Sequence, residues 1–130
     1  MVFQGLRTAI CHVGDLQEAK EWYSEVLGIS PYFDEPFYVS FNVGGYELGL
    51  DPDVTGVTRG DNVVAYWGVK DAAVAYQRIL GLGAQKHSEP REVGGGIVVA
   101  AVKDPFGNVF GIIENPHFKL AAGTDEGGPR

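Results

Sequence analysis

Three side chains suited to acid–base chemistry lie in two short segments of the first half of the chain. Glu47 and Asp51 stand two residues on either side of Gly49, and His12 lies in the segment "TAICHV" (residues 8–13). An imidazole and carboxylates can exchange protons with a substrate or attract a cation. Solvent exposure explains each of them singly, so these residues are candidates and not yet a defined catalytic group.

The same residues belong to a larger polar set with a period of two. Segments 8–13, 37–43, 46–51 and 62–69 alternate apolar and polar residues, which is typical of strands with one covered face. A buried polar group without a hydrogen-bond partner costs about 1–3 kcal/mol, so we expect solvent, a partner chain or a ligand at the polar face. With two strand glycines added, the predicted ligand-binding residues are Thr8, His12, Tyr38, Ser40, Asn42, Glu47, Gly49, Asp51, Asn62, Tyr66 and Gly111.

The two glycines interrupt strands of similar outline. Gly49 lies in "GGYELGLDP" (44–52) and Gly111 in "FGNVFGIIENP" (106–116). Glycine weakens a strand by about 0.5–1 kcal/mol relative to alanine, so its presence indicates that space is needed. Either a ligand approaches the backbone there, or the glycine accommodates sheet twist or a packed side chain. The first interpretation predicts that valine at either position blocks a ligand without loss of stability.

Two helices must hold these strands in place. Asp15 is placed to cap the first helix, Glu18 follows three residues later as in a capping box, and Gly28 is placed to end it. Asp71 begins a second helix that ends by Gly83. Apolar residues recur every three or four positions in both, which predicts one buried stripe on each.

The chain reads as two copies of one unit. Asp15 and Asp71 are 56 residues apart, and Gly45 and Gly107 are 62 residues apart. Each half reads as a strand, a helix and three strands, so we predict an α+β fold of two βαβββ units, each a curved mixed sheet with a helix on one face. One domain of residues 1–130 is expected, with a first unit at about 4–51, a linker at 52–60, a second unit at about 61–115 and a flexible tail at 117–130.

Composition excludes several classes of partner. The 130 residues carry a formal net charge of -7, which argues against nucleic acid and against an anionic membrane surface. No apolar run reaches the ~20 residues of a membrane-spanning helix, and Cys11 is the single cysteine, which leaves no intrachain disulfide. We therefore expect a cytoplasmic protein.

Three segments together resemble the vicinal oxygen chelate superfamily, which includes glyoxalase I, extradiol dioxygenases and bleomycin-resistance proteins. They are "VGDLQEAKEWYSEVLGI" (13–29), "NVGGYELGLDP" (42–52) and "VKDPFGNVFGIIE" (102–114). The resemblance covers the chain from about Leu6 to Glu114 and implies that the two curved sheets form a cleft. It also implies a divalent metal held at the positions of Thr8, Gly49, Val64 and Gly111.

None of those four residues is a usual metal ligand. His12 lies four residues beyond Thr8, about 13 Å along a strand, which is too far to replace a missing ligand. We therefore predict no metal and no cofactor at the family's site. A displaced metal near His12, Glu47 and Asp51 stays a minor alternative.

The resemblance to the bleomycin-resistance branch then implies metal-independent binding of a small organic molecule, with sequestration of a toxic compound. The alternative is a glyoxalase-like lyase, isomerase or dioxygenase relative with a displaced metal or none, and a third is a structural module. The segment "SPYFDEPFY" (30–38) either stacks on a flat or cationic ligand or packs as an ordinary hairpin. We expect a homodimer, because open sheet edges favour pairing with another chain and because the resemblance implies a partner that completes the clefts.

Overall fold

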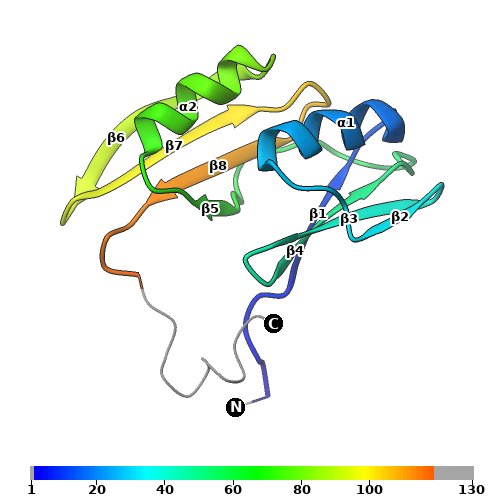
Figure 1. The fold of residues 1–130 in the computed structure, drawn as a ribbon, viewed down its shortest axis with the longest axis horizontal. Helices are drawn as coiled ribbons and strands as arrows, with labels where there is room; N and C mark the ends of the chain where they lie inside the picture. The colour runs from blue at the N-terminus through cyan, green and yellow to red at the C-terminus, as the bar shows by residue number, and fades with distance from the viewer. Residues whose placement is uncertain (1, 119–130) are drawn as a thin grey trace. The chain divides into compact units, whose positions relative to one another are not determined.

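The structure, a computed structural model, describes residues 2–118 of the chain. The described chain divides into two compact units, the first ending at Thr55 and the second running from Gly56 to Phe118 (Figure 1). The division falls inside the predicted linker at 52–60, and each unit is described by itself below. The predicted single domain and the cleft stay predictions, and most of the predicted tail lies outside the described residues.

The first unit is a four-stranded mixed sheet with one helix (Figure 1). The strand order is β1-β4-β3-β2, in which β1 and β4 are parallel and the other pairs antiparallel. Its elements are β1 (Thr8–His12), α1 (Leu16–Leu27), β2 (Phe33–Glu35), β3 (Tyr38–Val43) and β4 (Tyr46–Asp51).

The ends of α1 follow the predicted signals. The side chain of Asp15 accepts a hydrogen bond from the backbone N–H of Glu18 at 3.0 Å, and Gly28 ends the helix in the left-handed region at φ 70°. The helix packs against β3 and β4. Burying one helix stripe on one sheet face is the main source of stability for such a unit. The buried apolar side chains of this unit are Val13, Ala19, Tyr23, Val26, Val39, Phe41, Leu48 and Leu50.

A two-residue turn joins β3 to β4 and fixes their register. Gly44 and Gly45 have φ of 61° and 94°, the conformation that a type I′ hairpin turn requires at both positions. Val43 therefore stands opposite Tyr46. Counting outward from this pair places Asn42 opposite Glu47 and Ser40 opposite Gly49.

The second unit repeats this arrangement. Its sheet has the order β5-β8-β7-β6, with β5 and β8 parallel, and α2 packs against β6, β7 and β8. The predicted α+β fold of two βαβββ units is confirmed. Its elements are β5 (Tyr66–Gly68), α2 (Ala72–Gly81), β6 (Gln85–Gly94), β7 (Ile97–Lys103) and β8 (Val109–Glu114). Within the described part of the chain, neither helix is long and apolar enough to cross a membrane.

Two local predictions were wrong. The strand predicted at 62–69 is only three residues long in β5, because its pairing with β8 begins at Tyr66 opposite Gly111. Phe37, the first residue of the strand predicted at 37–43, precedes β3 and is 66% exposed. The segment 30–38 contains β2, which pairs antiparallel with β3, in agreement with the hairpin alternative.

Candidate functional site

Most of the predicted binding residues lie on one face of the first unit's sheet. In the observed register, Thr8 neighbours Glu47 and His12 neighbours Asp51, so these four side chains point to the same side. This side is opposite the one on which the buried residues of β3 and β4 meet α1. We call it the polar face; it carries Thr8, Ile10, His12, Phe33, Glu35, Tyr38, Ser40, Asn42, Glu47, Gly49 and Asp51.

Glu47 is the centre of a hydrogen-bonded group on the polar face. The Thr8 hydroxyl donates to its Oε1 at 2.7 Å, and the Tyr38 hydroxyl donates to its Oε2 at 3.0 Å. The three residues come from β1, β4 and β3, so the contacts tie three strands together. Hydrogen bonds to a carboxylate are stronger than those between neutral groups, and this group therefore has a fixed geometry.

The Tyr38 side chain lies across Gly49. A Cβ added at Gly49 would overlap the Tyr38 hydroxyl and lie 2.5 Å from the ring carbon that bears it. The strand glycine thus accommodates a packed side chain, and the interpretation that it leaves open space was wrong. Loss of hydration, the hydrogen bond to Glu47 and the Glu47 charge together raise the pKa of Tyr38 from 10.0 to about 12.

Other predicted residues of this face have local partners. His12 Nδ1 lies 2.8 Å from the backbone oxygen of Asp53, and the Asp51 carboxylate accepts from the Asp53 N–H at 2.9 Å. Asn42 Oδ1 accepts from the N–H of Gly45 at 2.7 Å and so supports the hairpin turn. Ser40 is 1% exposed beside Gly49. The Glu47 group is therefore the part of the polar face in which side chains from three strands meet.

The remaining predicted residues belong to the second unit. Tyr66 pairs with Gly111 and is 45% exposed, whereas Asn62 precedes β5 and is exposed. A Cβ added at Gly111 would lie 2.7 Å from the carbonyl oxygen of Ala65 and 2.8 Å from a methyl carbon of Val64. Close backbone approach explains this glycine, so the two strand glycines have different causes.

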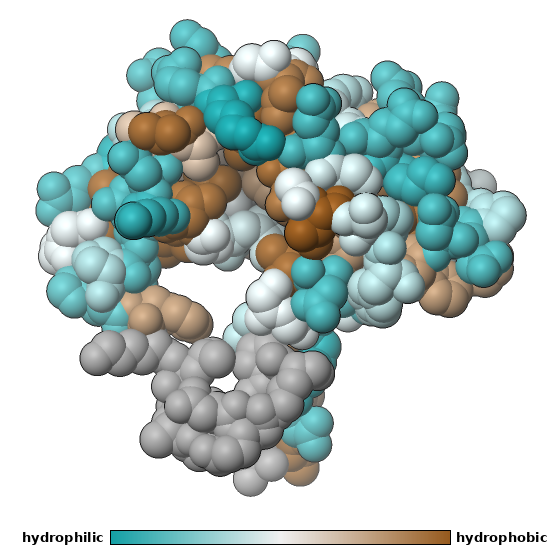
Figure 2. Space-filling model, in the orientation of Figure 1, coloured by the Kyte–Doolittle hydropathy of each residue, from teal (hydrophilic) through white to brown (hydrophobic). Residues whose placement is uncertain are grey.

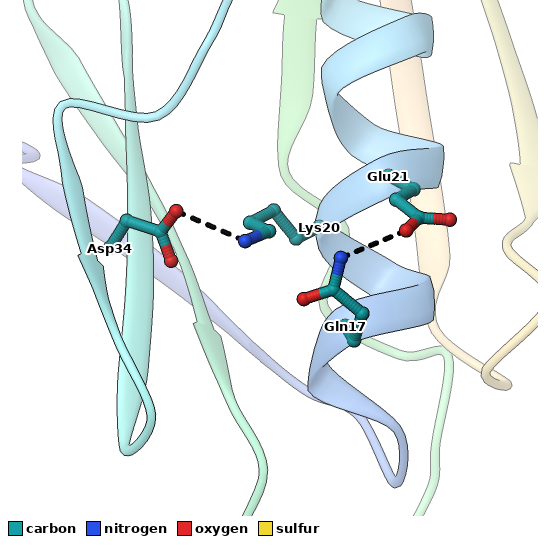
Figure 3. A network of polar contacts seen from close by, with 4 residues as sticks. All are labelled: Gln17, Lys20, Glu21 and Asp34. Carbon is teal, nitrogen blue, oxygen red and sulfur yellow. Dashed lines mark hydrogen bonds and ion pairs between the residues drawn. The ribbon is translucent and has the colours of Figure 1, made fainter.

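Two hollows of the first unit, of about 660 and 480 Å³, flank α1 and β2. Both are lined by Lys20 and Asp34, whose Nζ and Oδ2 atoms form an ion pair at 3.0 Å (Figure 3). Gln17 donates to Glu21 at 2.8 Å on the same helix (Figure 3). No predicted binding residue lines either hollow. Hydrophilic residues cover much of the surface seen in Figure 2, with apolar residues showing between them.

Residues 7–112 match the family model described as the Glyoxalase/Bleomycin resistance protein/Dioxygenase superfamily. The match covers most of the chain and both repeat units. The chain belongs to this superfamily. No curated protein matches the sequence closely enough to count as a relative.

Solved structures of the superfamily share the fold. A glyoxalase-related enzyme from Fulvimarina pelagi matches with a TM-score of 0.74 at 22% identity, over 92% of this chain and 94% of that one. A glyoxalase/bleomycin resistance protein from Albidiferax ferrireducens T118 matches with a TM-score of 0.69 at 19% identity, over 85% and 98%. The fosfomycin resistance protein FosX from Listeria monocytogenes matches with a TM-score of 0.74 at 14% identity, over 89% and 97%.

The residues at the superfamily's implied metal positions do not fit a metal. The Thr8 hydroxyl is engaged with Glu47, Tyr38 occupies the space above Gly49, and Gly111 has the Ala65 carbonyl against it. Val64 has no donor atom. Among residues 2–118, no group of three or more His, Cys, Asp or Glu side chains is arranged to hold a metal ion.

Three residues of the polar face, Ile10, Phe33 and Glu35, were not among the predicted binding residues, and Phe33 is the one that contacts Tyr38. Phe33 stands opposite Ser40 and is 38% exposed, with its ring centroid 6.3 Å from that of Tyr38. Phe33 lies between Pro31 and Pro36 in the segment 30–38, for which ligand stacking and ordinary hairpin packing were both left open. The alternation of Phe33 and Glu35 was the available signal for a short edge strand.

Proposed function

We propose that the protein binds a small organic molecule without a divalent metal at the superfamily's usual position. One observation carries this proposal: the Tyr38 hydroxyl occupies the space above Gly49, where a ligand side chain would project, and is held there by Glu47. The hydrogen-bonded pair of Tyr38 and Glu47 thus occupies the position at which the superfamily resemblance implies a metal ligand. Sequestration of a toxic compound, as in the bleomycin-resistance branch, is the role we infer, in a cytoplasmic protein.

One feature supports a binding role over catalysis. The one imidazole of the polar face, His12, contacts the Asp53 carbonyl and not the Glu47 group. One structural neighbour is a fosfomycin resistance protein, and we infer that this chain likewise handles a toxic organic molecule. The alternative is a glyoxalase-like lyase, isomerase or dioxygenase relative with a displaced metal or none, and the similarity to a glyoxalase-related enzyme from Fulvimarina pelagi is compatible with it.

Elemental analysis tests the proposal directly. Protein loaded with Mn, Ni, Zn or Fe and then dialysed should retain clearly less than one metal ion per chain, and Thr8→Ala should not change this. A thermal-shift screen of small organic molecules in the presence of a chelator should then yield a ligand. One tightly held metal per chain, or ligand binding that disappears on chelation, would contradict the proposal.

A further inference from the structure

Building on this proposed function, we propose that the polar face of the first unit selects organic cations. The carboxylate of Glu47 is the anchor for an ammonium group, and the rings of Tyr38 and Phe33 contact the ligand beside it.

The first step concerns the charge of Glu47. Its two hydrogen-bond donors, Thr8 and Tyr38, are neutral hydroxyls, so they orient the carboxylate without cancelling its charge. Neither the ion pair between Lys20 and Asp34 nor that between His87 and Asp61 includes Glu47. A carboxylate offers about four acceptor positions. Two of them remain for donors from a ligand.

The second step concerns the surroundings of that carboxylate. The polar face carries three carboxylates, those of Glu35, Glu47 and Asp51, with His12 as its one basic side chain and no lysine or arginine. Charges of one sign on one face favour a ligand of the opposite sign and repel one of the same sign. An anion is therefore excluded from this face more strongly than a neutral molecule is.

The third step rests on aromatic rings and not on charge. The rings of Phe33 and Tyr38 are 6.3 Å apart at an interplanar angle of 54°, and Phe37 lies edge-on to Phe33 at 6.0 Å. Phe33 and Phe37 are 38% and 66% exposed. Ring faces attract cations within about 6 Å of their centroids. The Tyr38 ring, whose hydroxyl contacts Glu47, thus lies beside the exposed Phe33 ring, and this arrangement suits an ammonium group attached to an apolar or flat body.

Three matched probes test the inference. At neutral pH, phenethylamine is a cation, 2-phenylethanol is neutral and phenylacetate is an anion, while all three carry the same ring. In amide NMR titrations, we expect phenethylamine to shift the signals of Thr8, Phe33 and Glu47. It should bind at least about tenfold more tightly than the other two probes.

Two charge-removing variants make the test specific. Glu47→Gln should reduce the cation preference by about fivefold or more, because the amide keeps the shape and loses the charge. Glu21→Gln is the matched control, since it removes one carboxylate from the hollow beside α1 and should leave the preference unchanged. Amide spectra without probe establish that both variants are folded.

The inference and the proposed function fail by different results. Four results would overturn the inference alone. The three probes could bind equally, the cation could fail to bind up to about 10 mM, or the preference could survive Glu47→Gln. The fourth is a set of signal shifts confined to Lys20, Glu21 and Asp34. A neutral or anionic molecule from the screen that binds at the polar face without metal would still support the proposed function. A stoichiometric metal would overturn the proposed function itself.

Discussion

At the scale of single residues, the contact between Gly49 and Tyr38 is the feature that distinguishes this chain's first unit. The glycine has no Cβ because the Tyr38 hydroxyl occupies that space, and the hydroxyl in turn binds Glu47. The absence of a side chain at Gly49 and the position of the Tyr38 side chain therefore depend on each other. Two predictions follow from it.

The first prediction concerns Gly49→Ala. The added methyl group forces the Tyr38 ring away from Glu47, and loss of a hydrogen bond to a charged group should lower the free energy of unfolding by about 1–2 kcal/mol. In a Tyr38→Ala background, the same change should raise it by about 0.5–1 kcal/mol, because alanine is favoured over glycine in a strand. Urea unfolding of the four proteins measures this coupling, and equal effects in both backgrounds would refute the contact.

The second prediction concerns the ionisation of Tyr38. Its pKa is raised in the folded chain to about 12, so its contribution to stability is present below about pH 10 and is lost between about pH 10 and pH 12. The free energy of unfolding should fall over that interval, and Tyr38→Phe should reduce the fall. Glu47→Gln should lower the pKa of Tyr38, as followed by the ultraviolet absorbance of tyrosinate.

Tyr76 provides an internal reference for that titration. Burial and the charge of Glu89 also raise its pKa, and its hydroxyl has no hydrogen-bond partner in the described structure. It lies in the second unit, so its titration should be the same in the parent protein and in Glu47→Gln. A shift of both tyrosines together would mean that the variant had disturbed the fold.

At the scale of elements, the two units reach similar sheets by different local means. In the second unit, the backbone oxygen of Ala65 lies against Gly111, and the Gly111 N–H donates to that oxygen at 3.2 Å. The edge strand β5 is thus held close to β8 by the absence of a side chain. Rotation of a neighbouring side chain cannot relieve a clash with a carbonyl oxygen.

The third prediction uses this difference. Gly111→Ala should lower the free energy of unfolding by about 1–3 kcal/mol, because β5 must move away from β8. Truncation of Val64 or Tyr66 to alanine should not restore stability, whereas truncation of Tyr38 restores it for Gly49→Ala. Thermal and urea unfolding give the comparison. Full rescue by Tyr66→Ala would show that the side chain, not the backbone, is the obstacle.

The elements that could be predicted from the sequence are those with local signals. Asp15 and Gly28 act on their own neighbours in the chain, and the structure confirms the start and end of the helix that they predicted. Gly44 and Gly45 are local signals of the same kind for the turn between β3 and β4. Strand β2 and the limits of β5 depend on pairing with residues distant in sequence. Strand β6 was not located, because its mostly exposed residues have no apolar alternation and its ladder has three irregularities.

The candidate site was predictable only in part. Period-two alternation correctly placed Thr8, Tyr38 and Glu47 on one face. It could not show that Tyr38 reaches diagonally across Gly49 to Glu47, because that contact depends on the rotamer of one side chain and on space left in another strand. Whether the predicted residues bind a ligand stays a prediction.

At the scale of the whole molecule, each sheet has two edge strands with one unpaired side. They are β1 and β2 in the first unit and β5 and β6 in the second. Unpaired edges favour association with another chain unless they are short or protected. Together with the superfamily membership, this supports the homodimer that the sequence suggested.

The fourth prediction is therefore a mass of twice 14.0 kDa in solution. Light scattering coupled to size exclusion, at micromolar protein concentration and at moderate and high salt, measures it. Each chain carries a net charge of -7, so the two chains of a dimer repel each other electrostatically. High salt screens this repulsion and should therefore not dissociate the dimer. A monomer under both conditions would contradict the prediction.

The seating of Tyr38 over Gly49 also has an evolutionary consequence. A return to metal chelation in the first unit would need a carboxylate at Gly49, but Tyr38 blocks that substitution until it is itself replaced. Replacement of Thr8 by histidine would remove the hydrogen bond that the Thr8 hydroxyl donates to Glu47 before any metal was bound. Each single step toward a metal site therefore costs stability, so such a site could form in the first unit only through several coupled substitutions.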